Sequence, residues 1–374
     1  MKKKEILKAL DTVVGGLLAV FLGHFLTRRA RNPRFPQKAK CLIIRPGGIG
    51  DAVSLIPAIN SIKECHPHWK IDVLAEKRNG EVFSACKSVS KIYLYDRKLE
   101  LLRCLSKRYD VAIDTEQWHR LSALTALFSS PFTIGFETNE RGKLFSIPCK
   151  YSLDTNEIES FMQLTEWVSQ KKSPRDLFFA PPFLTPGVDV SETNVKKIGR
   201  LGKGKRVCIS VGGSIPEKIW EKDSFITLIN RLFQRGINVI LIGGAEEKQM
   251  ARQINNGLLF SENLNKKILD LTGDTTLLET AAIMRKTDLL LCGDTGILHL
   301  GAAIGIPTLS LFGPGNPRKW APRGRRHKHL TGDAPCSPCS KFGYTPKCSK
   351  DALCIKTISV SDVERAVLFL LANS

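Results

Sequence analysis

The sequence predicts an α/β protein made of two doubly wound domains that follow one another along the chain. At 374 residues the chain is long for one hydrophobic core and sufficient for two. From residue 40 onward, short apolar runs alternate with helical patterns, which is typical of parallel sheets covered by helices on both faces. The alternation stops over residues 173–191, which contain four prolines, and then starts again.

The first predicted domain covers residues 37–180. Its expected strands lie at 41–45, 70–76, 91–96, 109–116 and 132–137, and its expected helices at 51–64, 98–107 and 122–129. Pro57 falls inside the first helix and is expected to kink or restart it, because proline lacks the backbone N–H of a helix interior.

The second predicted domain covers residues 181–374 and repeats the pattern. Its expected strands lie at 206–212, 238–244, 288–294 and 307–313, and its expected helices at 224–236, 245–256, 276–287 and 297–305. The run at 307–313 is the last clear strand. Two such domains facing each other across a cleft would bind ligands beyond the carboxyl ends of their strands.

Four glycine-containing turns follow apolar strands, at 45–51, 211–220, 242–247 and 292–303. Glycine after a strand often only turns the chain, but four such turns at one sheet edge favour a shared ligand site. In the last turn, Gly293 and Gly296 let the backbone approach a ligand before a helix whose free N–H groups suit a phosphate. Asp294 or Thr295 could also simply cap that helix.

Two charged residues stand out at these turns. Lys218 lies on the loop after the 206–212 strand, where a lysine can reach a diphosphate as a point charge, although most lysines are merely solvated. Asp51 opens the helix after the "RPGGIG" turn, where a carboxylate is the wrong charge for a phosphate. It is either a helix cap or a general base that accepts the proton of an attacking hydroxyl.

Two nucleotide-binding signatures are missing. Val53 stands where the third glycine of a dinucleotide fingerprint would follow Gly48 and Gly50, and no Gly-Lys-Ser/Thr phosphate loop occurs. An NAD-dependent oxidoreductase and a nucleoside triphosphatase are therefore disfavoured. The net charge of +20 indicates an acidic partner such as anionic lipid, nucleic acid or a phosphorylated small molecule.

The N-terminal 1–36 segment indicates attachment to a membrane. Residues 1–40 carry ten basic and two acidic residues, and residues 12–27 carry none of either. Sixteen helical residues span roughly 24 Å, short of the ~30 Å hydrocarbon core. The run is therefore short for a spanning helix. Arginines follow it at once, where a signal peptide would have a cleavage site, so an interfacial helix fits best. A buried helix of the soluble fold is the alternative.

Together these motifs resemble glycosyltransferase family 9, the ADP-heptose:lipopolysaccharide heptosyltransferases. The resemblance rests on "GGIGDAVSLIPAINSIK", "GGSIPEKIWEKDSF", "LIGGAEE", the block at 270–314 and "NPRKWAP", in this order. It implies a GT-B fold and an inverting, metal-independent transfer of heptose from ADP-heptose to a lipopolysaccharide acceptor. The family's loop is usually proline-glycine-alanine, where this chain has "VGGS" at 211–214.

The resemblance also implies roles for individual residues. Asp51 matches the catalytic base, beside an acceptor-side loop of Gly47, Gly48 and Gly50. The implied donor site comprises Gly213, Ser214, Lys218, Gly243, Gly244, Gly293, Asp294, Thr295, Gly296 and His299. No cofactor is required, and the implied partners are a nucleotide sugar, a lipid-linked glycan acceptor and an anionic membrane surface, but no nucleic acid. The implied location is the cytoplasmic face of the inner membrane.

Four clustered cysteines remain. Cys336, Cys339, Cys348 and Cys354 follow a C-x2-C-x8-C-x5-C spacing, which could hold a structural zinc. Reduced or paired thiols are the alternative. Other functions also stay open: transfer from another nucleotide sugar, a sugar-nucleotide epimerase of similar fold, and a membrane-tethered glycan-binding relative without activity.

Overall fold

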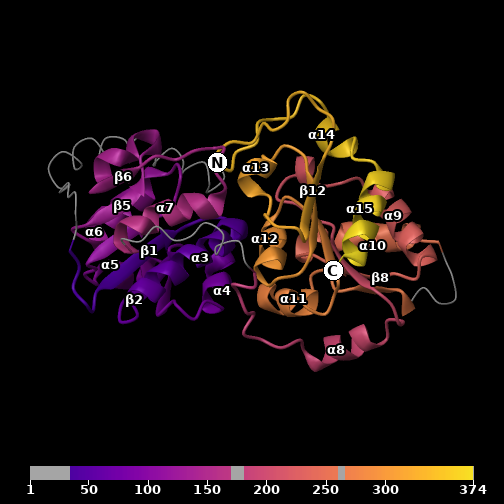
Figure 1. The fold of residues 1–374 in the computed structure, drawn as a ribbon, viewed down its shortest axis with the longest axis horizontal. Coiled ribbons are helices and arrows are strands. Elements are labelled where there is room, and N and C mark those ends of the chain that lie inside the picture. Colours follow the sequence, from indigo (N-terminus) through magenta and orange to yellow (C-terminus); the bar gives the residue numbers. More distant parts are fainter. Residues whose placement is uncertain (1–33, 170–180, 260–265, 374) are drawn as a thin grey trace. The chain divides into compact units, whose positions relative to one another are not determined.

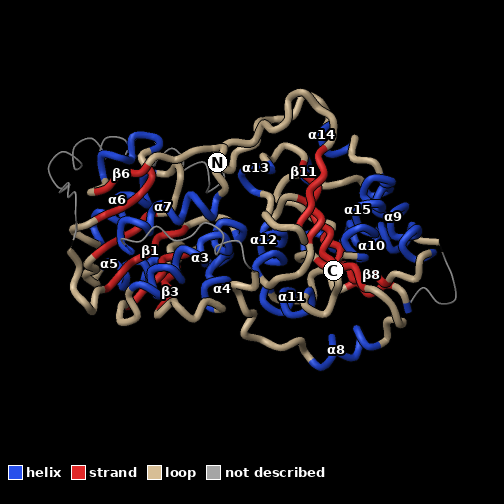
Figure 2. Tube along the Cα trace, in the orientation of Figure 1, coloured by secondary structure: helices blue, strands red, loops and turns tan. Residues whose placement is uncertain are grey.

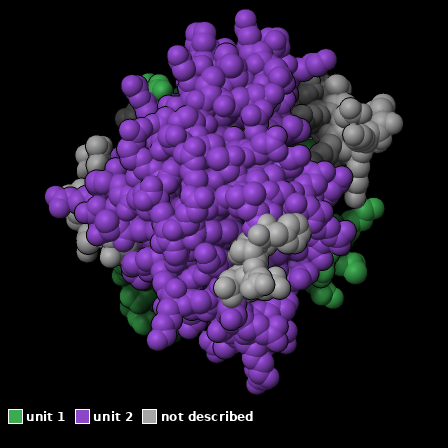
Figure 3. Space-filling model, turned by 90° about the vertical axis from the view of Figure 1, so that its right-hand side faces the viewer, with its two compact units in different colours: residues 1–178 green, residues 179–374 purple. Residues whose placement is uncertain are grey.

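The computed structural model describes residues 34–169, 181–259 and 266–373. The chain divides into two compact units, residues 1–178 and 179–374, which are coloured separately in Figure 3. Each unit is built around a six-stranded sheet with helices on its faces (Figures 1 and 2). The expected helix within residues 1–33 lies outside the described residues.

In unit 1 the sheet is entirely parallel, with the strand order β3-β2-β1-β4-β5-β6. Its strands are β1 (Lys40–Arg45), β2 (Lys70–Ala75), β3 (Lys91–Leu94), β4 (Val111–Asp114), β5 (Thr133–Phe136) and β6 (Ile147–Cys149). The central strand β1 is buried except at its first residue, as expected of a strand covered on both faces. The short edge strand β6 was not expected.

The helices of unit 1 connect these strands. They are α3 (Ile49–Cys65), α4 (Lys77–Ser84), α5 (Lys98–Leu105), α6 (Arg120–Ser129) and α7 (Glu157–Ser169). Pro57 does not restart the helix: α3 continues through it as one helix. Ten of its residues, Pro57 among them, are buried, and α3 packs along α7. This burial outweighs the single backbone hydrogen bond that proline removes.

In unit 2 the sheet is also parallel throughout, with the order β12-β11-β10-β7-β8-β9. Its strands are β7 (Arg206–Ser210), β8 (Asn238–Ile242), β9 (Ile268–Asp270), β10 (Leu289–Gly293), β11 (Thr308–Phe312) and β12 (His327–Thr331). The expectation that residues 307–313 form the last strand was wrong. Strand β12 has the sequence HKHLT and is only half-buried at the sheet edge, so it lacks the apolar signal of a buried strand.

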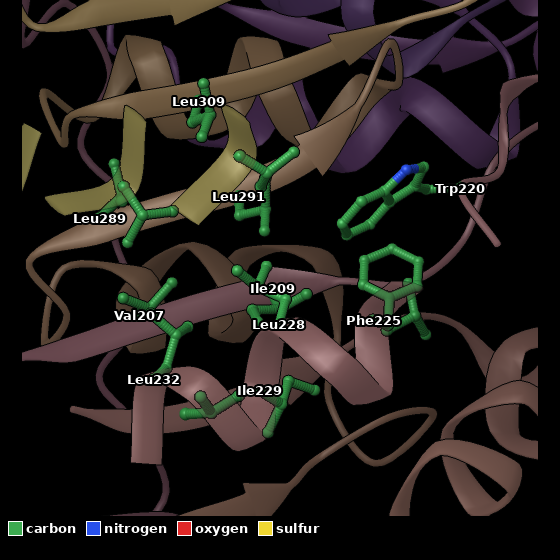
Figure 4. Packing of buried hydrophobic residues seen from close by; sticks show 14 of the residues in the cluster. Val207, Ile209, Trp220, Phe225, Leu228, Ile229, Leu232, Leu289, Leu291 and Leu309 are labelled. Carbon is green, nitrogen blue, oxygen red and sulfur yellow. The ribbon is translucent and has the colours of Figure 1, made fainter. Parts of the chain in front are cut away.

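The helices of unit 2 cover both faces of its sheet. They are α8 (Glu192–Gly199), α9 (Lys222–Gln234), α10 (Lys248–Gly257), α11 (Leu277–Met284), α12 (Gly296–Ala303), α13 (Pro317–Trp320), α14 (Leu353–Lys356) and α15 (Val360–Ala372). Figure 1 shows α9, α10 and α15 on one face and α11 and α12 on the other. On the first face, Leu228 and Leu232 of α9 pack against Ile209 and Leu291 of the central strands (Figure 4).

Both sheets have the same topology. Counted along each unit, the spatial order of the strands is 3-2-1-4-5-6, which is the order of a doubly wound nucleotide-binding fold. The order reverses between β1 and β4 in unit 1 and between β7 and β10 in unit 2. Ligands of such sheets bind at the carboxyl ends of the two strands that flank the reversal. The turns after these four strands are therefore where functional side chains are expected.

Candidate active site

In unit 1, the turn after β1 presents Asp51 at the start of α3. Gly47 has a φ of +122°, which favours glycine, and Gly48 precedes the helix. A Cβ added to Gly48 would lie 2.7 Å from the Asp51 Oδ2 atom, so a side chain at this position would displace the Asp51 carboxylate. The Asp51 side chain is 19% exposed and accessible to solvent. A substrate hydroxyl can therefore reach the Asp51 carboxylate, as a proton acceptor requires.

Directly behind Asp51 lies Arg45, the last residue of β1. Its side chain is 3% exposed, and its Nη2 atom lies 3.8 Å from Asp51 Oδ2 and 3.6 Å from Glu116 Oε2. Its Nη1 atom donates a hydrogen bond to the Thr115 carbonyl at 2.7 Å. Burial alone would lower the pKa of Arg45, but the charges of Asp51 and Glu116 raise it above its usual value. Arg45 is thus a fixed, buried cation between two carboxylates.

Glu116 follows β4, on the other side of the strand-order reversal. Its carboxylate accepts hydrogen bonds from the backbone N–H groups of Gln117 at 3.1 Å and Trp118 at 3.2 Å. Burial would raise the pKa of Glu116, but Arg45 and Arg141 outweigh burial and lower it. Glu116 therefore stays ionised and, like Asp51, faces the Nη2 atom of Arg45.

In unit 2, the turn after β7 positions Lys218. Two residues later, the buried Trp220 donates its indole N–H to the Ile358 carbonyl at 3.0 Å. The Trp220 ring also meets Phe225 of α9 edge-on, with ring centroids 5.1 Å apart (Figure 4). This anchor fixes the loop on the hydrophobic core, so the position of Lys218 is set by packing as well as by its own contacts.

Lys218 forms an ion pair with Asp294, which follows β10. Its Nζ atom lies 2.7 Å from Asp294 Oδ2 and 3.4 Å from the Asp294 carbonyl oxygen. The two side chains are 17% and 7% exposed. The contact depends on Gly293, because a Cβ there would lie 2.8 Å from the Lys218 carbonyl oxygen. The loop after β7 thus reaches the end of β10 by close backbone approach.

Beside this ion pair, helix α12 begins at Gly296. Thr295 is its N-cap residue, but the Thr295 side chain makes no capping hydrogen bond. Its buried Oγ1 atom has no hydrogen-bond partner within the described residues. Free N–H groups, an unused hydroxyl and the Lys218 ammonium lie at one sheet edge. This combination suits an anion such as phosphate. Further along α12, the His299 ring lies 6.1 Å from the Trp320 ring.

The turn after β8 contributes an acid. Glu247 follows Gly243 and Gly244, and a Cβ added to Gly212 would lie 2.6 Å from Glu247 Oε1. A Cβ on Gly244 would lie 3.0 Å from Glu247 Oε2. The carboxylate of Glu247 therefore lies over two glycine backbones at the carboxyl ends of β7 and β8. This is where a doubly wound fold binds the ribose of a nucleotide.

The family of the chain follows from its sequence. The profile of glycosyltransferase family 9 (heptosyltransferase) matches residues 99–349, more than half of the chain. The chain belongs to glycosyltransferase family 9. It is accordingly an enzyme, a glycosyltransferase, as the motifs indicated.

Similar proteins agree with this assignment. Lipooligosaccharide heptosyltransferase 2 of Haemophilus ducreyi is 22% identical over 341 residues, covering 85% of this chain and 89% of the relative. The structure of the ADP-heptose LPS heptosyltransferase II of E. coli matches with a TM-score of 0.69 at 20% identity, covering 89% and 99% of the two chains. A family 9 structure from Veillonella parvula matches with a TM-score of 0.75 at 16% identity, covering 92% and 100%. The predicted GT-B class, with two Rossmann-like units, is confirmed.

The structure places the predicted site residues in two sets. Within unit 1 it brings together Gly47, Gly48, Gly50 and Asp51. Within unit 2, Lys218 contacts Asp294, and Gly213 and Gly293 make room for the Lys218 loop. Ser214 is exposed on that loop. Gly243 and Gly244 lie under Glu247. The roles assigned to all of these residues remain predictions.

Sequence reasoning missed Arg45, Glu116 and Glu247. A usable signal existed for the first two, because each is a charged residue at the end of a buried apolar strand that flanks the strand-order reversal. Glu247 gave a weaker signal, an acid following a Gly-Gly turn. Within the described residues, no helix is both long enough and apolar enough to cross a membrane.

The structure gives no support to a structural zinc at the four cysteines, which was one of the two possibilities left open by their spacing; all four are free thiols. Among the described residues, no group of three or more His, Cys, Asp or Glu side chains is arranged to hold a metal ion. Burial raises the pKa of Cys354, and nearby Cys339, Cys336 and Cys348 raise it further, so the four thiols do lie in one region. Cys354 is buried on α14, whereas Cys336 is exposed on an irregular loop.

Proposed function

We propose that this chain transfers a heptose from ADP-heptose to a hydroxyl group of a lipopolysaccharide core acceptor. The observation that carries the proposal is in unit 2, where Lys218 pairs with Asp294 directly before the start of α12, and the buried Thr295 hydroxyl at that start has no hydrogen-bond partner among the described residues. The names of similar proteins support the same substrates. One solved neighbour is called an ADP-heptose LPS heptosyltransferase, and a curated relative is called a lipooligosaccharide heptosyltransferase.

The donor diphosphate would bind at this anion site. Lys218 would contribute its ammonium charge, and α12 would contribute its free N–H groups and positive dipole end. Lys218 would then either contact both Asp294 and the diphosphate, or break its ion pair with Asp294 to contact the diphosphate alone. Glu247 would accept hydrogen bonds from the ribose hydroxyls, the role of an acid at the end of a neighbouring strand in nucleotide-binding sheets. His299, one turn into α12, would lie near the diphosphate or the sugar.

Asp51 would act as the general base. In the proposed step, an Asp51 carboxylate oxygen takes the proton of the acceptor hydroxyl, and the oxygen of that hydroxyl forms a bond to the anomeric carbon of heptose. The bond between this carbon and the diphosphate oxygen breaks, and ADP leaves with the electron pair. A single displacement inverts the anomeric configuration. Lys218 and the start of α12 would stabilise the charge of the leaving diphosphate, so the step would need no metal.

The charge of the chain supports the proposed acceptor and location. A lipopolysaccharide core carries acidic groups on a lipid, and a chain of net charge +20 is suited to such a partner. The basic, apolar residues 1–36 would hold the enzyme at the cytoplasmic face of the inner membrane, where basic residues contribute about 1 kcal/mol each near anionic lipid.

The experiment is a titration of ADP, UDP, GDP and CMP into wild type, Lys218→Ala and the matched control Lys222→Ala. Lys222 lies four residues later, 42% exposed, at the start of α9. We expect ADP alone to bind, with roughly tenfold weaker affinity in Lys218→Ala and unchanged affinity in the control. Tighter binding of UDP or GDP would be consistent with a glycosyltransferase but would contradict ADP-heptose as the donor.

Transfer is tested separately with Asp51→Asn. We expect ADP binding to be retained and turnover to fall by at least about a hundredfold. NMR of the product reports the anomeric configuration, and activity after exhaustive chelation reports the metal requirement. Unchanged turnover in Asp51→Asn would remove the assignment of the base.

A further inference from the structure

Unit 1 exposes apolar side chains on the outside of two neighbouring helices. Leu99 and Leu102 of α5 are 70% and 61% exposed, and Phe128 of α6 is 60% exposed. The opposite side of α5 is already packed, because Cys104 and Leu101 lie in the core of unit 1. Single exposed apolar residues are ordinary, but three on an adjacent pair of helices are not. We call Leu99, Leu102 and Phe128 the α5–α6 patch.

The three residues lie on two helices of unit 1 that contact each other. Helices α5 and α6 contact each other and share one hydrophobic cluster, and Figure 1 shows them side by side. Phe128 lies four residues after Leu124 and seven after Leu121, so all three occupy one stripe of α6. Leu121 and Leu124 pack into the cluster shared with α5, and Phe128 extends this stripe into solvent.

Basic residues accompany the α5 part of the patch. Lys98 and Arg103 lie on α5, and Lys107 and Arg108 follow it; all four are exposed. Residues 96–108 contain five basic residues and two acidic ones. An apolar centre with a basic rim is the composition of elements that lie at a lipid–water interface, because the apolar groups enter the acyl boundary while the cations contact phosphates.

Phe128, at one end of the patch, lies toward the sheet edge at which the described chain begins. Helices α5 and α6 each connect parallel strands, so their C-terminal ends lie at the edge where the strands begin. Phe35 is fixed at this same edge, with its ring centroid 5.4 Å from Trp69 and 5.2 Å from Phe132, which directly precede β2 and β5. Phe35, near the start of the described chain, therefore lies at the sheet edge toward which the C-terminal ends of α5 and α6 point.

We propose that the α5–α6 patch is a second contact with an anionic lipid surface, built into the folded part of unit 1. Leu99, Leu102 and Phe128 would enter the headgroup region, and Lys98, Arg103 and Arg108 would bind lipid phosphates. The contact would fix the orientation of unit 1 on the membrane, which a single N-terminal attachment leaves free to rotate. This inference does not depend on the identity of the donor sugar.

The test uses the full-length chain and vesicles of phosphatidylcholine with or without phosphatidylglycerol. We expect hydrogen exchange in residues 98–108 to slow only with the anionic vesicles. We expect Leu99→Ser/Leu102→Ser to lower the partition coefficient about tenfold, and Arg103→Glu/Arg108→Glu to do the same at low salt. The matched controls are Leu259→Ser, 68% exposed in unit 2, and Lys203→Glu, also exposed in unit 2; both should bind as wild type.

Two results would overturn the proposal. One is unchanged exchange in residues 98–108 together with wild-type vesicle binding of both patch variants, which would leave the N-terminal segment as the sole attachment. The other is a lipid-free dimer of the wild type that Leu99→Ser/Leu102→Ser dissociates, which would assign the patch to a second copy of the chain. ADP binding should be unchanged in every patch variant, so failure of this proposal is distinct from failure of the proposed reaction.

Discussion

Lys218 and Asp294 lie 76 residues apart in the chain, yet their side chains meet at 2.7 Å at the carboxyl ends of two adjacent strands. This contact joins the two sequence motifs most strongly indicated as phosphate-binding. It also means that the cation proposed to hold the diphosphate is already paired with an anion. A diphosphate must compete with Asp294 for Lys218 or share it.

The first prediction concerns this competition. Asp294→Asn keeps the shape of the side chain but removes its charge, so Lys218 becomes more available to an anion. We expect ADP to bind severalfold more tightly and the free energy of unfolding to fall by about 1–3 kcal/mol, because a mostly buried ion pair is lost. Calorimetric titration measures the affinity. The gain in affinity should vanish in Asp294→Asn/Lys218→Ala; a gain that persists would mean that Lys218 does not hold the diphosphate.

The second prediction concerns Arg45 as a positioning residue for Asp51. Arg45→Met leaves the carboxylates of Asp51 and Glu116 without their common cation, which we expect to destabilise unit 1 by about 3–5 kcal/mol. Arg45→Lys keeps the charge but loses the planar guanidinium. It should therefore be more stable than Arg45→Met but still have a lower kcat than wild type. In both variants kcat should fall while the affinity for ADP is unchanged, because the anion site belongs to unit 2. A loss of ADP affinity in Arg45→Lys would contradict this role.

The third prediction concerns the close approach at Gly293. Gly293→Ala places a Cβ 2.8 Å from the Lys218 carbonyl oxygen, so the Lys218 loop must shift. We expect a loss of about 1–3 kcal/mol in stability and roughly tenfold weaker ADP binding. Gly199→Ala at the end of α8 is the matched control, because nothing lies within 4 Å of its new Cβ. It should be neutral or slightly stabilising, and wild-type binding in Gly293→Ala would show that the loop is not constrained there.

The fourth prediction concerns acid sensitivity. Burial, with a smaller effect of Arg326, lowers the pKa of His327 from 6.5 to about 4, and the His327 ring lies 3.0 Å from the Thr308 hydroxyl. Between these values the unfolded chain binds the proton and the folded chain does not, so stability increases with pH in this window. The free energy of unfolding is therefore not reduced by His327 above pH 6.5, and it falls by up to roughly 3 kcal/mol as the pH falls toward 4.

Urea denaturation from pH 7.5 down to 4.5 measures this effect. His327→Gln should flatten the decline in stability with acidification. The exposed His68→Gln should reproduce the wild-type curve. A curve for His327→Gln as steep as wild type would show that His327 is not the titrating group, and His329, whose pKa burial also lowers, would be the next candidate.

Local patterns in the sequence determined much of the architecture. Apolar runs such as 41–45 and 289–292 become buried central strands because every side chain on both faces is covered, and this leaves a continuous apolar signal. Glycine turns and nearby charges indicated Asp51, Lys218 and Asp294, because a strand, a tight turn and a helix start are all local features. The same motifs were also sufficient to indicate the family.

Tertiary structure alone decided the rest. The edge strands β6 and β12 form because a neighbouring strand supplies hydrogen-bond partners, so their own residues carry little signal. Pro57 stays within one helix because of burial that only the fold creates. The ion pair of Lys218 with Asp294, and the place of Arg45 between Asp51 and Glu116, depend on which strands become neighbours. Strand order is set by packing between distant segments, and for this reason the sequence determined which groups could act but not which groups meet.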